Sequence, residues 1–300
     1  MKQDLRSGRS LTTWQRKIFP YVMIAPNLLI FGIFIVIPAI YGLWYSLHSW
    51  SGIGPMEFVG LSNYKEALTD RHFWGSMERT VIYVGLSIPL LLTIPLGFAL
   101  LLSQPLKGVG IFRGALYWPN MISFIVAGIA FKFLFNDDSG VINYLLQAMG
   151  SEPVRWLTRS TTATLVVILA TIWQGTGFYM IIYIAGLQSI PSQYYEAASI
   201  DGASRWQKFR HITLPLLRPT TFMVLTLGLI NLFKTYGMVM ALTGGGPVRA
   251  TKFIVQLIYD TAFVDTRLGY ASAISFLLFI IVALLTTLQF ALGEGGTQHD

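Results

Sequence analysis

The chain alternates between long apolar runs and shorter polar stretches. Six of these runs are long enough to cross about 30 Å of hydrocarbon as helices. They cover residues 21–47, 81–102, 114–135, 163–187, 216–242 and 270–292. Prolines such as Pro89 and Pro95 interrupt several runs, but neighbouring helices in a membrane bundle can satisfy the carbonyl groups that a proline frees. The pattern therefore predicts an all-α, polytopic membrane bundle of six transmembrane helices, some of them kinked.

Composition supports a membrane environment. Hydrophobic residues make up 54% of the chain and charged residues only 12%, about half of the usual share in a soluble domain. The net charge of +7 would also suit a protein that binds nucleic acid. However, the basic residues are scattered between the apolar runs and form no basic face, so we expect a lipid environment and no nucleic-acid partner. Cysteine is absent, which excludes disulfides and thiolate metal sites.

The distribution of Lys and Arg predicts the orientation. The first 19 residues form a basic tail with five cations, namely Lys2, Arg6, Arg9, Arg16 and Lys17. Because positive charge near the first span tends to stay inside, we expect this tail in the cytoplasm. The apolar run that follows is too long for a signal peptide, so we interpret it as an uncleaved first span. Six spans (within residues 20–292) then place the C-terminal tail, residues 293–300, on the cytoplasmic side as well.

The segment at about residues 188–215 connects the fourth and fifth spans and should be cytoplasmic. Pro191 and Ser192 are typical of a helix start. Asp201-Gly202 is a turn pair, because glycine adopts positive φ without steric penalty. A second short helix should run from about residue 203 to 211, and Pro215 should open the next span. The segment is therefore predicted to form two short helices joined at a glycine turn.

This segment has a surface suited to close packing. Small residues would allow another surface to approach closely, and these are Ala197, Ala198 and Ala203. Larger apolar residues would anchor such a contact, and these are Tyr195, Ile200, Trp206 and Phe209. The same residues would also suit an amphipathic helix lying on lipid headgroups. Local physics alone leaves both interpretations open.

A longer pattern favours the protein contact. Glu196-Ala197-Ala198, then Gly202, then Ile212-x-Leu214-Pro215 resembles the EAA loop of ABC importer permeases. Other segments are similar to the six-span carbohydrate permeases of the maltose and glycerol-phosphate type, including Trp173-Gln174, Leu134-Phe135-Asn136 and Leu242-Thr243-Gly244-Gly245-Gly246-Pro247. The chain departs from that pattern at Gly237, where many relatives carry an acidic residue.

The resemblance implies a division of labour. The chain would be one of two permease subunits, the second being a different chain, in a bacterial or archaeal cytoplasmic (inner) membrane. An extracytoplasmic solute-binding protein would deliver the solute, and separate ABC ATPase subunits would bind ATP and Mg²⁺. The residues implied to couple the permease to the ATPase are Glu196, Ala197, Ala198, Asp201, Gly202, Ala203, Ile212, Leu214 and Pro215. The chain itself has no Gly-x-x-x-x-Gly-Lys-[Ser/Thr] motif, so we expect no cofactor in it and no enzymatic activity of its own.

Polar residues inside the apolar runs are candidates for a solute path, because polar groups that face lipid are unfavourable. The candidates are Gln174, Tyr179, Asn231 and Lys234. Amide and aromatic side chains are suitable partners for sugar hydroxyls. The alternative is that these groups form hydrogen bonds between helices.

Two other functions stay open. One is a permease of the same class for a non-carbohydrate solute. The other is a polytopic membrane enzyme, which would need clustered ionisable groups. The four histidines are far apart in the sequence, at His48, His72, His211 and His299. We therefore predict no catalytic residues and no metal site.

Overall fold

The computed structural model describes residues 13–104 and 107–294. Most of the predicted N-terminal tail and most of the C-terminal tail lie outside these residues. Helices dominate the described part, as predicted, and its β structure is a short antiparallel pair, β1 (His48–Ser49) with β2 (Glu57–Phe58).

Four helices are long and apolar enough to cross a membrane. The first is continuous over Ile18–Ser46 and contains most of α1 (Thr13–Phe31), a π-helical turn at Gly32–Val36 and α2 (Ile37–Ser46). The others are α4 (Arg71–Leu102), α8 (Ser160–Gln188) and α15 (Leu268–Glu294). Two bent helix pairs raise the possible number of spans to six. The fold class predicted from the sequence is confirmed.

The third predicted span is strongly bent. It consists of α5 (Val109–Tyr117), a 3₁₀ turn at Trp118–Met121 that contains Pro119, and α6 (Phe124–Leu134). The two halves meet at 98°. The side chain of Ser123 accepts a hydrogen bond from the Val126 N–H at 3.3 Å and so caps the start of α6. A kinked helix was expected here, and the structure has a helix that stops and starts again.

The fifth predicted span is also interrupted. It begins with α12 (Arg218–Phe233) and resumes at α13 (Gly237–Leu242). Residues 234–236 form a non-helical break between them. The C-terminal halves of the two interrupted spans, α6 and α13, pack against each other so closely that a Cβ on Gly128 would lie 2.7 Å from the Met238 carbonyl oxygen.

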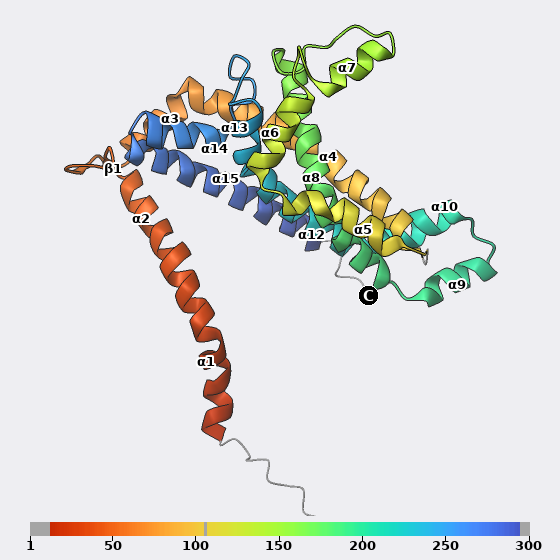
Figure 1. Cartoon of the computed structure of the whole chain (residues 1–300). Helices are drawn as coiled ribbons and strands as arrows, with labels where there is room; N and C mark the ends of the chain where they lie inside the picture. The colour runs from red at the N-terminus through yellow and green to blue at the C-terminus, as the bar shows by residue number, and fades with distance from the viewer. Residues whose placement is uncertain (1–12, 105–106, 295–300) are drawn as a thin grey trace, which may run out of the picture.

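Helix α8 lies at the centre of the bundle, and the first helix lies at its periphery. More than half of the most apolar window of α8 is buried (56%), against 0% for the first helix. Gly177 lets α8 touch the end of α5, because a Cβ there would lie 2.2 Å from the Leu116 carbonyl oxygen. In contrast, α1 extends away from the other helices, and only the far end of α2 packs against α15 (Figure 1).

Short helices lie in the two loops that precede and follow α8. The loop before α8 carries α7 (Val141–Ala148), and the loop after it carries α9 (Ser192–Ile200), α10 (Arg205–Lys208) and α11 (Leu214–Leu216). Because α8 has 29 residues, it separates these connections by about 43 Å. They project from different parts of the bundle (Figure 1). The remaining short helices are α3 (Ser62–Thr69) and α14 (Ile254–Tyr259), with a π-helical turn at Asp260–Val264 after α14.

Candidate functional site

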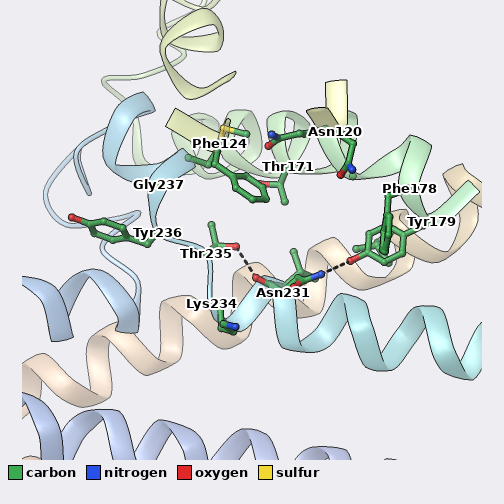
Figure 2. Close-up of a pocket in the computed structure, with 15 residues that line it drawn as sticks. Asn120, Phe124, Thr171, Phe178, Tyr179, Asn231, Lys234, Thr235, Tyr236 and Gly237 are labelled. Atoms are coloured by element: carbon green, nitrogen blue, oxygen red, sulfur yellow. Dashed lines mark hydrogen bonds between the residues drawn. The ribbon is translucent and has the colours of Figure 1, made fainter. Parts of the chain in front are cut away.

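A cavity of about 320 Å³ lies where the two interrupted spans face α8. We call it the central cavity. It is lined by all four polar residues that the sequence suggested, Gln174, Tyr179, Asn231 and Lys234. The other lining residues shown in Figure 2 include three with amide or hydroxyl groups, Asn120, Thr171 and Thr235, and three aromatic residues, Phe124, Phe178 and Tyr236.

Gln174 joins the wall of the central cavity to the bend in the third span. Its side chain is 2% exposed, and its Nε2 donates a hydrogen bond to the Ile122 carbonyl oxygen at 2.6 Å. Ile122 lies in the bend, where helical hydrogen bonding is interrupted. The Oε1 atom of Gln174 is buried and has no partner within the described part of the chain. The amide therefore has a structural contact on one side and an unused acceptor on the other.

Asn231 and Tyr179 form a second polar contact across the cavity. Asn231 Nδ2 donates to the Tyr179 hydroxyl at 3.2 Å, which links α12 to α8 (Figure 2). The hydroxyl of Thr235 donates to the Asn231 carbonyl oxygen at 3.3 Å. These bonds are of the interhelical kind that the sequence also allowed, and they leave the Asn231 side-chain oxygen available to a ligand.

Lys234 lies in the break of the fifth span and not inside a helix. The sequence placed it within a continuous fifth span, but it follows the last residue of α12, in the break. Figure 2 shows its side chain on the far side of the Asn231–Thr235 segment from Phe124. It also borders an open groove between α12 and α15. Within residues 13–104 and 107–294 the two ion pairs are Lys252–Asp260 and Arg267–Glu66, so the Lys234 ammonium has no acidic partner there.

The connection between α8 and α12 has the two short helices joined at a glycine turn that its sequence predicted, but Pro215 does not open the next span. It lies in α11, and the helix Arg205–Leu216 is bent by 62° against α12, which begins at Arg218. Helix α9 is followed by the Asp201-Gly202 turn, and Gly202 has a φ of +72°. Ser204 and Gln207 form a capping box at the start of α10. The second helix continues beyond α10 as a π-helical turn over Phe209–Thr213 before α11. We refer to residues 192–216 as the α9–α11 segment.

Hydrogen bonds hold the two halves of the α9–α11 segment together. Ala203 N–H donates to the Ala198 carbonyl oxygen at 2.8 Å across the turn. Lys208 Nζ donates to the Ser199 hydroxyl at 2.6 Å. The Tyr195 and Thr213 hydroxyls lie 3.0 Å apart, so the half-buried Tyr195 turns towards the second half of the segment and is not an outward anchor.

The opposite face of the segment is open. Ile200 is 87% exposed and Trp206 is 65% exposed, although both are large apolar side chains. Glu196, Ala197, Asp201 and Gly202 are also exposed, and a Cβ on Gly202 would meet nothing within 4 Å. Of the other predicted coupling residues, Leu214 is exposed and four are half-buried, namely Ala198, Ala203, Ile212 and Pro215. Exposed apolar residues of this size indicate a contact surface.

The loop that carries α7 is organised by two side chains that were not among the predicted site residues, those of Asn143 and Asp137. We call residues 135–159 the α7 lobe. Asn143 is 3% exposed and bonds to Asp137, Val154 and Trp156. The Asp137 carboxylate accepts from the Leu157 N–H at 2.9 Å and from the Thr158 hydroxyl at 2.5 Å. Partial burial by itself raises the pKa of Asp137, but the hydrogen bonds from residues 156–158 together outweigh it and lower the pKa below its ordinary value.

Three cavity residues were also missed, although a signal for them existed. Asn120, Thr171 and Thr235 are polar residues inside predicted spans, as the four candidates are. Asn120 directly follows Pro119, where a break in the helix is most easily formed.

Interrupted apolar spans surround a cavity lined by amide, hydroxyl and aromatic side chains, as in a multi-pass membrane protein. Residues 72–294 match the family described as "Binding-protein-dependent transport system inner membrane component". The chain belongs to this family of ABC importer permeases, whose members are transport components and not enzymes.

Two relatives cover almost the whole chain. The trehalose/maltose transport system permease protein MalF of Thermococcus litoralis is 36% identical over 275 residues, which is 91% of this chain and 93% of the relative. The sn-glycerol-3-phosphate transport system permease protein UgpA of Agrobacterium fabrum is 36% identical over 286 residues, which is 93% of this chain and 95% of the relative.

A solved structure has the same fold. It is a bacterial ABC transporter involved in the import of the acidic polysaccharide alginate, and one of its chains superimposes with a TM-score of 0.82. The match covers 95% of this chain and 98% of that chain, at 23% sequence identity.

Proposed function

We propose that this chain forms half of the membrane path for a sugar or an oligosaccharide, and that a separate ATPase drives the transport. The central cavity is the observation that carries the proposal. Its wall combines aromatic rings with amide and hydroxyl groups, and a sugar offers CH faces to the former and hydroxyl groups to the latter. The unpartnered Oε1 of Gln174 is an acceptor for such a hydroxyl.

The named relatives support a carbohydrate. The Thermococcus litoralis protein is a trehalose/maltose permease. A sugar phosphate is a second candidate, because Lys234 borders the cavity without an acidic partner among the described residues, and the Agrobacterium fabrum relative is a glycerol-phosphate permease. A lysine ammonium is a common partner of phosphate groups.

The α9–α11 segment is proposed to couple the path to ATP hydrolysis. Its outward face carries Ile200 and Trp206, which would fill a groove on an ABC ATPase subunit, while Glu196 would make a polar contact there. The hydrogen bonds across the Gly202 turn make the segment stiff enough to transmit motion. In this proposal ATP and Mg²⁺ bind to the ATPase and not to this chain.

The exposure of the first helix supports the presence of a second membrane subunit. None of its most apolar window is buried within this chain, and α1 extends away from the bundle (Figure 1). A neighbouring permease, which we expect to be a different chain, would pack against it and complete the central cavity from the other side.

The proposed orientation follows from the coupling role. If the α9–α11 segment meets an ATPase, it is cytoplasmic, and with six spans both termini are cytoplasmic too. The α7 lobe would then face the outside, where a solute-binding protein delivers the solute. Reporter fusions at residue 300 and at residue 245 should report cytoplasmic and external positions respectively. A cytoplasmic signal at residue 245 would contradict this topology.

Uptake by a reconstituted complex tests the proposed function. The chain would be purified from its native membrane with the subunits that accompany it, and reconstituted with the solute-binding protein. Maltose, trehalose, maltotriose and larger neutral saccharides, together with glycerol 3-phosphate, would be offered with ATP on the ATPase side. We expect ATP-dependent uptake of at least one saccharide or sugar phosphate. Uptake restricted to amino acids, polyamines or inorganic ions would contradict the proposal.

A further inference from the structure

Three aromatic rings form a row that leads away from the central cavity. Tyr236 lines the cavity in the break after α12, at the opposite end from Phe178 and Tyr179 in Figure 2. Its ring centroid lies 5.0 Å from that of Tyr259, which in turn lies 5.0 Å from that of Phe263. We call Tyr236, Tyr259 and Phe263 the aromatic row.

The local fold turns this row outward. Helix α14 buries Ile254 and Leu257 against the bundle, so that Tyr259 lies on its other face. The π-helical turn that follows buries Thr261 and Ala262 and leaves Phe263 outside. Tyr259 is 41% exposed and Phe263 is 65% exposed, and their rings are tilted at 45° to each other, so both rings remain accessible.

The surroundings of the row are polar at one edge. Asp260 directly follows Tyr259 and pairs with Lys252. Lipid-facing surfaces exclude such charges, and a purely helix-packing surface has no need of them. A chain of exposed rings bordered by charged groups fits a ligand that has both apolar faces and hydroxyl groups.

We propose that the aromatic row is a binding track on which successive rings of a saccharide stack between the outer surface and the central cavity. This inference rests on the proposed function of the cavity. The Asp260 carboxylate accepts hydrogen bonds from hydroxyl groups at the edge of the stack, and Tyr236 passes the leading sugar ring to the amides of the cavity.

Substitutions separate stacking on rings from general apolar packing. The test uses the reconstituted complex and a saccharide that it takes up. Tyr259→Leu and Phe263→Leu keep apolar side chains but remove the rings, and each should raise the KM for uptake by about threefold to tenfold. Tyr259→Trp and Phe263→Tyr keep a ring and should retain near-normal uptake. Phe133→Leu is the matched control, because Phe133 is 73% exposed on α6 and outside the row.

The length of the saccharide gives a second readout. The loss in the Leu variants should be larger for a trisaccharide than for a monosaccharide or disaccharide, because a longer chain reaches more rings. If Leu and aromatic variants transport equally well, or if Phe133→Leu is impaired to the same degree, the track does not exist. Unmodified complex that takes up no saccharide would instead contradict the proposed function itself.

Accessibility decides whether the row is open in the assembled complex. The chain has no cysteine, so Phe263→Cys introduces a unique thiol. A membrane-impermeant maleimide should label this thiol in the complete complex, and the transported saccharide should slow the labelling. A thiol that is unreactive without saccharide would show that a neighbouring subunit covers the row, and would overturn the proposal.

Discussion

The side-chain amide of Gln174 on α8 is bonded at 2.6 Å to the carbonyl oxygen of Ile122 in the bend of the third span. This bond replaces the helical partner that the carbonyl loses where α5 and α6 meet at 98°. A single side chain therefore fixes the shape of the cavity wall and at the same time offers an acceptor to the cavity.

Replacing Gln174 by Met should destabilise the chain. The half-buried Ile122 carbonyl would lose its partner, which costs up to about 1–3 kcal/mol. Thr176→Val is the matched control, because the Thr176 hydroxyl bonds to the Ile172 carbonyl within α8 and does not reach the bend. Thermal unfolding of the detergent-solubilised complex should show a lower Tm for Gln174→Met than for Thr176→Val. Equal Tm values would show that the bend does not depend on this bond.

Substitution of Asn231 tests contact with the solute without breaking the bond between Gln174 and the bend of the third span. Asn231→Leu removes an amide from the cavity, and Tyr179→Phe removes the same Asn231–Tyr179 hydrogen bond while keeping the amide. If Asn231 contacts the solute, Asn231→Leu should raise the KM for uptake about tenfold, while Tyr179→Phe stays within about threefold. ATPase co-purification should be normal in both. Equal losses in the two variants would assign Asn231 to helix packing alone.

Acid should loosen the α7 lobe. The pKa of Asp137 is lowered in the folded chain, so its carboxylate stabilises the lobe at pH values above the ordinary carboxyl pKa, and this contribution is lost as the pH falls through the lowered pKa. Hydrogen exchange at the Leu157 and Thr158 amides should therefore accelerate, after correction for intrinsic rates, only below about pH 4. Asp137→Asn should show weaker protection already at neutral pH. Protection that is independent of both changes would contradict this role.

The helices themselves were largely predictable from hydropathy. The predicted span at residues 163–187 corresponds to α8, because an uninterrupted apolar run has only its own backbone to satisfy its polar groups in a membrane. Pro119 indicated a kink near the first break, but the sequence did not show that the helix stops at residues 122–123 or at residues 234–236. The group that satisfies Ile122 comes from Gln174, 52 positions away, and the sequence pattern does not indicate that pairing.

The candidate site was likewise predictable from the sequence only in part. Gln174, Tyr179, Asn231 and Lys234 stood out as polar residues in apolar runs, and the structure brings all four to one cavity. Their contact with solute stays a prediction. The aromatic row could not be found from sequence, because Tyr236 and Tyr259 come from different elements and only the packing of α14 places them together.

In the proposed mechanism the α9–α11 segment transmits the motion driven by ATP hydrolysis to the membrane spans. Two substitutions address it. Glu196→Lys reverses an exposed charge on α9, and Gly202→Val places a β-branched side chain where φ is +72°, which is strained for such residues. Asp138→Lys is a matched control, since it reverses an exposed charge in the α7 lobe at the other end of α8. Gly202→Asn controls for the turn, because Asn tolerates this conformation.

The most direct measurement is solute-stimulated ATP hydrolysis by the purified complex, with the amount of co-purified ATPase determined in the same samples. Glu196→Lys and Gly202→Val should lose the stimulation or release the ATPase, while Asp138→Lys and Gly202→Asn should keep both. All variants should still insert into the membrane. If Glu196→Lys and Gly202→Val retain normal ATPase binding and normal stimulation, the α9–α11 segment is not the coupling element.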